Sequence, residues 1–163
     1  MTKISIYINI LKNYIKYFPI FIVLSLSQAQ AEIGGDFTLR DYNNNKYHLY
    51  SSSKEKVIFF GFLNCPDICP TTLSEVSNLL KRLDGLSDKI EPIFITVDPT
   101  RDTPELLKNY LSFFDKRIIG LTGSQEEIEE VANKYHVYYS YQDKETKEDY
   151  TVNHTANIYF LNK

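Results

Sequence analysis

The sequence is poor in side chains that bind soft metals: it contains two cysteines, three histidines and a single methionine, the initiator. Two thiols can form neither a structural zinc site of four cysteines nor a disulfide-dense scaffold. With only one thioether, a methionine-rich metal site is also excluded. Any thiol chemistry must therefore use Cys65 and Cys69, and any imidazole must come from His48, His136 or His154.

The charge balance is nearly even, which excludes a second class of function. The chain of 163 residues carries 18 basic and 21 acidic side chains, a formal net charge of −3 at pH 7. Nucleic-acid-binding domains are typically basic, so no nucleic-acid partner is expected. The length fits a single domain and, with 43% hydrophobic residues, is sufficient to bury a core.

The N-terminal segment, residues 1–31, differs from the rest of the chain. It contains Lys3, Lys12 and Lys16 but no acidic residue, followed by an apolar run over 17–27 and Ala-Gln-Ala at 29–31. A basic start, a short apolar stretch and an A-x-A site are typical of a secretory signal peptide. We predict that residues 1–31 are such a signal or, alternatively, an uncleaved membrane anchor, and that residues 32–163 form an exported domain.

Strand and helix patterns alternate through residues 32–163. Apolar runs predict, after a short hairpin over 37–39 and 46–50, the strands Val57–Phe62, Ile93–Val97, Ile118–Leu121, Val137–Tyr141 and Tyr150–Leu161. Helices are predicted from Pro70, from Pro104 after a Thr103 cap, and after Ser124, which forms a capping-box pattern with Glu127. This alternation predicts an α/β fold whose mixed central sheet is parallel at its centre, with antiparallel strands added late.

The cysteine pair Cys65-Pro66-Asp67-Ile68-Cys69 follows a predicted central strand and opens a predicted helix. Two residues four apart share one side of a helical turn, about 5–6 Å between Cβ atoms, so the thiols can form a disulfide or bind one ion. A helix N-terminus favours the thiolate form. The alternative is that both cysteines are small buried apolar residues.

His154 is the best candidate for a third ligand. It lies early in the predicted strand Tyr150–Leu161, which we expect to run antiparallel to Val57–Phe62 and so to begin at the edge where the cysteines lie. His48 and His136 have no such topological argument and are interpreted as structural. Two thiolates with one imidazole suit Cu(I), and Cu(II) with a further ligand, whereas zinc would need a fourth ligand or water. Asp98 ends the neighbouring strand, where it either orients a ligand or meets a partner, or is simply a turn residue before the next helix.

The residues around these side chains resemble a known family. The stretch GFLNCPDICPTTL at 61–73 resembles the signature of the Sco/SenC copper proteins, and FITVDPTRDTP at 94–104 resembles their second motif. LTG at 121–123 and VNHT at 152–155 complete the match, which runs from about Ile33 to the end. The resemblance implies a thioredoxin-like fold, copper ligation by Cys65, Cys69 and His154, and copper delivery to the binuclear centre of cytochrome c oxidase.

Two departures from the family pattern carry expectations of their own. Leu63-Asn64 stands where the family usually has Thr-His, so an accessory imidazole beside the thiols is missing. This difference is expected to alter the tuning of the metal site but not the set of residues that bind the metal. The family usually continues beyond the histidine strand through another strand and a C-terminal helix, which this chain is expected to lack. Apolar surface around Tyr159–Leu161 is then expected to be exposed, in a domain that is marginally stable or needs a partner there.

The resemblance and the thiol pair leave two functions to separate. The first is a metallochaperone, not an enzyme, that carries Cu(I) and, with a further ligand, Cu(II) to the oxidase subunit with the binuclear site, its copper donor unknown. The second is a thiol-disulfide oxidoreductase that uses Cys65 and Cys69, although its spacer is one residue longer than that of C-x-x-C. Either would act in the periplasm, at the outer face of the inner membrane or in the mitochondrial intermembrane space, with membrane association through the N-terminus.

Overall fold

The computed structural model describes residues 33–142 and 150–162, with the side chain of Asp84 excepted. The predicted signal peptide or anchor, 1–31, lies outside the described residues, as does most of the charged loop before Tyr150. In the two described ranges, no helix combines the length and apolarity needed to cross a membrane.

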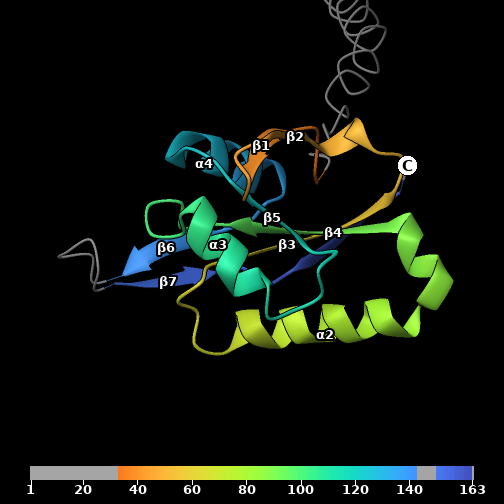
Figure 1. The fold of residues 1–163 in the computed structure, drawn as a ribbon. Helices are drawn as coiled ribbons and strands as arrows, with labels where there is room; N and C mark the ends of the chain where they lie inside the picture. Colours follow the sequence, from red (N-terminus) through yellow and green to blue (C-terminus); the bar gives the residue numbers. More distant parts are fainter. Residues whose placement is uncertain (1–32, 143–149, 163) are drawn as a thin grey trace, which may run out of the picture. The chain divides into compact units, whose positions relative to one another are not determined.

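The centre of the fold is a six-stranded mixed sheet with the order β2-β1-β5-β4-β3-β8 (Figure 1). Its strands are β1 (Thr38–Asp41), β2 (Lys46–His48), β3 (Glu55–Gly61), β4 (Ile90–Thr96), β5 (Ile119–Thr122) and β8 (Ile158–Leu161). Strands β3, β4 and β5 are parallel, and β1 and β8 join them antiparallel. The predicted α/β class with a mixed central sheet is therefore confirmed.

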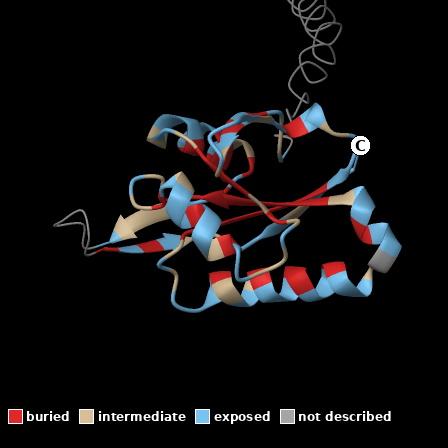
Figure 2. Ribbon diagram, in the orientation of Figure 1, coloured by how far each residue is buried: buried red, intermediate tan, exposed pale blue. Residues whose placement is uncertain are grey.

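Helices cover both faces of this sheet because successive strand residues point to opposite sides. Helices α2 (Ile68–Arg82) and α3 (Pro104–Leu111) pack on one face, in a cluster with Phe59 and Phe94. Helix α4 (Gln125–Lys134) packs on the other face, in a cluster with Ile58 and Phe60. Figure 2 shows the buried residues concentrated along the central strands and the inward sides of these helices.

The starts of the helices agree with their local signals, with one shift. Thr103 and Ser124 accept hydrogen bonds from the first turns of α3 and α4, and the capping box of Ser124 with Glu127 is formed. Helix α2, in contrast, begins at Ile68, two residues before the predicted start at Pro70. Proline is tolerated there because the first-turn N–H groups have no partner within the helix.

The predicted strand Tyr150–Leu161 is wrong, because the chain forms two strands in two sheets. Strand β7 (Thr151–His154) pairs only with β6 (Tyr139–Gln142) in a separate two-stranded ribbon. After β7 the Thr155 N–H donates to the Tyr138 carbonyl at 2.9 Å, and the chain then turns into β8. It is β8 that runs antiparallel to β3.

The expected apolar exposure near the end of the chain is confined to one face of β8. Ile158 is 38% exposed and Phe160 71% exposed, whereas Tyr159 packs edge-on against Phe60 and Tyr135 on the other face. Phe160 therefore lies on a sheet edge without cover among the described residues. Within them, the alternation of side chains along a strand explains why Tyr159 and Leu161 are partly buried instead.

The turn after β4 contains two buried carboxylates that connect distant segments. The Asp98 carboxylate accepts a hydrogen bond from the Tyr150 hydroxyl at 2.6 Å and pairs with the Arg101 guanidinium at 2.5 Å. The Asp102 carboxylate accepts from the Leu63 N–H at 3.0 Å and from the Thr96 hydroxyl at 2.5 Å. Asp98 thus fixes the start of β7, and Asp102 fixes the loop that follows β3.

The first of these connections predicts a loss of stability on removal of one hydroxyl. In Tyr150→Phe the buried Asp98 carboxylate loses a donor, which is expected to lower the free energy of unfolding by about 1–3 kcal/mol. Urea unfolding measures this change. Tyr138→Phe is the control because that side chain is 71% exposed. Equal unfolding free energies for the two variants would contradict the proposed connection.

The second connection predicts a pH dependence. Burial raises the pKa of Asp102 to about 6, so the folded state binds this proton more tightly than the unfolded chain. The resulting stabilisation is complete below about pH 4 and is lost as the pH rises through 6, by on the order of 2–3 kcal/mol. Asp102→Asn is expected to remove this part of the pH dependence in urea unfolding between pH 4 and 7. If the unfolding free energy of the wild type and of the variant changed with pH in parallel, this prediction would be contradicted.

Candidate metal centre

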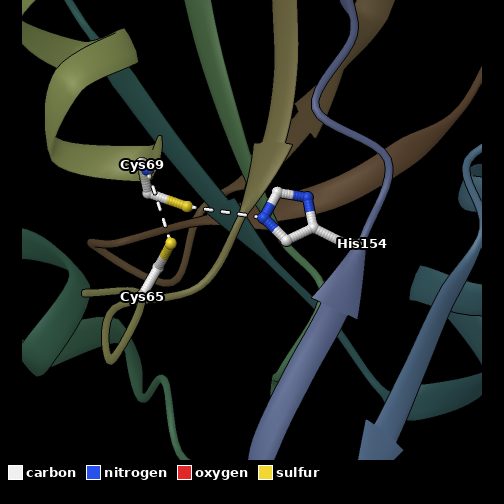
Figure 3. Close-up of side chains that lie close together, drawn as sticks. All are labelled: Cys65, Cys69 and His154. Atoms are coloured by element: carbon white, nitrogen blue, oxygen red, sulfur yellow. Dashed lines mark hydrogen bonds between the residues drawn. The ribbon is translucent and has the colours of Figure 1, made fainter. Parts of the chain in front are cut away.

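Three separate segments meet at the candidate site (Figure 3). Cys65 lies in the loop between β3 and α2, where its N–H donates to the Phe62 carbonyl at 3.3 Å. Cys69 is the second residue of α2, and His154 is the last residue of β7. The structure thus brings together the three side chains that the sequence singled out.

The geometry of the group suits one small ion. The two sulfur atoms and a ring nitrogen all lie within 4.8 Å of one another. The Cys69 Sγ lies 3.6 Å from the His154 Nε2, and the Cys69 N–H donates to the Cys65 Sγ at 3.4 Å. Both thiols are free, with Cys69 buried and Cys65 partly buried.

His154 is held with one ring nitrogen facing the thiols. Its Nδ1 lies 3.0 Å from the Thr155 carbonyl, which can only accept, so Nδ1 carries the proton. The Nε2 lone pair is then directed at Cys69, which is the arrangement a metal-ligating histidine needs. The ring also packs edge-on against Phe62, with centroids 5.7 Å apart.

His154 lies on a different strand from the one that the sequence predicts. His154 pairs with Tyr139 across the β6–β7 ribbon, and it is not part of the strand that pairs with β3. It still reaches the carboxyl end of β3 because β8 begins there, opposite Phe59, only four residues after His154. The predicted edge of the sheet is therefore correct, whereas the predicted strand pairing of His154 is wrong.

The electrostatics of the site are dominated by burial. Burial raises the pKa of the Cys69 thiol to about 12, despite its position in the first turn of α2. Loss of solvation therefore opposes, in the metal-free protein, the thiolate form that the helix N-terminus is expected to favour. Burial also lowers the pKa of His154, so its imidazole is neutral at pH 7. A metal must therefore displace a proton from Cys69.

Close packing leaves no room for a side chain between Gly61 and the Cys69 sulfur. A Cβ atom added to Gly61, the last residue of β3, would lie 2.7 Å from the Cys69 Sγ and 2.8 Å from the Phe94 ring. Only glycine at this position allows the sulfur to sit against the end of β3. In the sequence Gly61 opens the GFLNCPDICPTTL stretch at 61–73, but nothing there indicates its close approach to the Cys69 sulfur.

The other candidate residues lie outside the group. His48 faces the Thr38 hydroxyl, 2.9 Å from its Nδ1, and His136 follows α4 with a φ of 51°. Asp98 is the turn residue, and its carboxylate contacts Arg101 and Tyr150 rather than His154. The positioning role of Asp102 was missed, because hydrogen bonding to a residue 39 positions away leaves no local pattern.

The family model and the curated relatives that match this chain carry the same family name. The SCO1/SenC family model matches residues 26–163. The SCO2-like protein RP587 of Rickettsia prowazekii is 35% identical, with 100% of this chain and 85% of that protein covered. Protein SCO2, mitochondrial, of Saccharomyces cerevisiae is 41% identical over 79% of this chain, but only 44% of that protein is covered.

Solved structures show the same fold. Copper-bound ScoI of Bradyrhizobium japonicum is 45% identical and superposes with a TM-score of 0.74, covering 79% of this chain and 82% of that one. BsSco, described as a member of the Sco family of cytochrome c oxidase assembly proteins with a disulfide switch, is 31% identical with a TM-score of 0.54, covering 63% of each chain. The expected thioredoxin-like fold is confirmed, and the chain belongs to the SCO1/SenC family.

Proposed function

We propose that this protein is a metallochaperone that binds one copper ion through Cys65, Cys69 and His154 and delivers it to the binuclear copper centre of cytochrome c oxidase during assembly. The observation that carries the proposal is the convergence of two free thiols and a correctly oriented imidazole nitrogen within 4.8 Å. The copper bound to the related ScoI supports it.

The donor set favours copper over its main competitor. Two sulfurs and one imidazole are soft, and three ligands satisfy the low coordination that Cu(I) accepts, while Cu(II) would take a further ligand. Zinc prefers four ligands, and among the described residues the group contains three. The residues present thus fit copper as cargo.

The site also has a route for uptake and release. On binding, the Cys69 thiol gives up its proton and His154 offers its neutral Nε2 without any change of tautomer. Because coordination is incomplete, an incoming thiolate or imidazole from a partner can enter before any ligand leaves. We propose that His154 is the first ligand to leave, because it lies on a ribbon separate from both cysteines.

The compartment and partners follow from the same proposal. Residues 1–31 would act as a signal peptide or anchor, and 32–163 as the copper-binding domain on the exported side of a membrane. The mitochondrial relative in yeast and the oxidase-assembly role stated for the BsSco family support this placement and an oxidase subunit as partner. We propose no nucleic-acid partner.

A thiol-disulfide oxidoreductase is the second candidate, favoured by one observation. The free thiols lie close enough for the Cys69 N–H to donate to the Cys65 Sγ, and the related BsSco has a disulfide switch. The raised pKa of Cys69, caused by burial, weighs against its use as an attacking thiolate at neutral pH. In this candidate function His154 would have no part in ligand binding.

Removal of the imidazole separates the two functions. In His154→Ala, one equivalent of Cu(I) is expected to bind at least about 100-fold more weakly than to the reduced wild type, because a ligand is lost. The dithiol should still oxidise to a disulfide. Competition with a Cu(I) chelator measures affinity, and thiol titration measures oxidation.

His48→Ala is the matched control, since that imidazole lies on β2 and faces Thr38. Its copper affinity should equal that of the wild type. Unchanged affinity in His154→Ala would exclude His154 as a ligand and favour the oxidoreductase.

A second variant tests the position of the Cys69 sulfur without removing a ligand. Gly61→Ala places a Cβ within 2.7 Å of the sulfur, which is expected to displace it and weaken Cu(I) binding on the order of 10-fold. The same crowding should lower stability by about 1–3 kcal/mol. Gly85→Ala is the control, because its Cβ meets nothing within 4 Å. Wild-type affinity in Gly61→Ala would show that this sulfur does not hold the metal.

A further inference from the structure

The β6–β7 ribbon ends beside the candidate site with an irregular pair of residues. The register that pairs Tyr139 with His154 places Tyr138 opposite Thr155. Because the Thr155 N–H donates to the Tyr138 carbonyl at 2.9 Å, this pair is of the hydrogen-bonded kind. In a regular antiparallel ladder such a pair exchanges two bonds, so the Tyr138 N–H would donate to the Thr155 carbonyl in return.

The side chain of Thr155 takes the place of that second bond. The Tyr138 N–H donates to the Thr155 Oγ1 at 3.1 Å, and the hydroxyl donates in turn to the Tyr138 carbonyl at 3.3 Å. A hydroxyl can accept and donate at the same time, and threonine side chains compete with backbone groups in this way. The hydroxyl therefore satisfies the N–H that the Thr155 carbonyl would satisfy in a regular ladder.

The Thr155 carbonyl is directed instead at the neighbouring imidazole, where it lies 3.0 Å from the His154 Nδ1. In a regular ladder a carbonyl points across to the partner strand, not back at the preceding side chain. The substitution by the hydroxyl thus supplies the acceptor that keeps the proton on Nδ1. The Nε2 lone pair is left facing the Cys69 Sγ, 3.6 Å away (Figure 3).

The other contact of this imidazole does not select its tautomer. The His154 ring packs edge-on against Phe62, with centroids 5.7 Å apart and an angle of 89° between the ring planes. This contact restrains the plane of the ring, but the phenyl group has no hydrogen-bonding atom to select one nitrogen. Without the carbonyl, the proton is free to move to Nε2, where it occupies the lone pair that a metal needs.

We propose that Thr155 is a positioning residue for His154. Its hydroxyl replaces its own carbonyl in the ladder of the β6–β7 ribbon, and the released carbonyl holds the imidazole with Nε2 toward the thiols. The residue acts through the tautomer and orientation of His154 and does not itself contact the metal. This inference rests on the proposed binding of copper by His154.

The test is Thr155→Val, which removes the hydroxyl and keeps the size and the β-branched shape of the side chain. The Tyr138 N–H is then expected to draw the Thr155 carbonyl back into the ladder, away from His154. In the reduced, metal-free protein at about pH 8, above the ordinary pKa of histidine, the ring nitrogen-15 chemical shifts report the tautomer. The wild type should show a protonated Nδ1 and an unprotonated Nε2, and in the variant the two shifts should move toward each other.

Copper binding gives a second readout of the same change. The affinity of Thr155→Val for Cu(I), measured by competition with a chelator, is expected to be about 10-fold lower than that of the wild type. Thr155→Ser keeps the hydroxyl and should restore both the wild-type shifts and the wild-type affinity. Thr151→Val is the matched control, because Thr151 is an exposed residue at the far end of β7, opposite Gln142. It should leave both readouts unchanged.

The outcomes separate this proposal from the proposed function. Unchanged ring shifts in Thr155→Val, or a Thr155→Ser variant that behaves like Thr155→Val, would overturn the role of the Thr155 hydroxyl while leaving copper binding intact. The same losses in Thr151→Val would also overturn it, because they would reflect a general loosening of the ribbon. A wild type that binds no Cu(I) would overturn the proposed function, and the shifts of the metal-free protein would still decide whether Thr155 sets the tautomer of His154.

Discussion

The buried turn that follows β4 is the constraint on which the rest of the site depends. Asp98 holds Tyr150 at the start of the ribbon that carries His154, and Asp102 holds Leu63 at the start of the loop that carries Cys65. Two carboxylates four residues apart thus set the relative position of a dithiol between β3 and α2 and an imidazole on the β6–β7 ribbon. Arg101 contributes by pairing with Asp98 and lying 3.5 Å above the centre of the Tyr150 ring.

Local signals in the sequence predicted most of the architecture. The apolar runs of β3, β4 and β5 identified the buried centre of the sheet, and Thr103 and Ser124 marked two helix starts by capping chemistry that acts within three residues. The cysteine pair could be placed at the carboxyl edge because it directly follows β3. His154 was placed at that edge by topology, although its strand pairs with β6 rather than β3.

What the sequence did not predict depends on contacts between distant residues. The break between β7 and β8 follows from which partner each half finds, since β7 pairs with β6 and β8 pairs with β3. The raised pKa of Cys69 depends on how deeply the first turn of α2 is buried, a quantity that only packing defines. The role of Asp102 likewise exists only once the turn after β4 lies against the loop that carries Cys65.

The three proposed metal ligands are unevenly spaced along the chain, and this spacing gives the site a further property. Cys65 and Cys69 are four positions apart, whereas Cys69 and His154 are 85 positions apart. An ion held by both cysteines but not His154 closes a loop too short to restrict the unfolded chain, while a bond to His154 closes a loop across most of the domain. Loading would therefore act as a cross-link that lowers the conformational entropy of the unfolded polypeptide. The same ion would lose that effect at the moment its imidazole bond breaks, so cargo transfer and loosening of the domain would be one event.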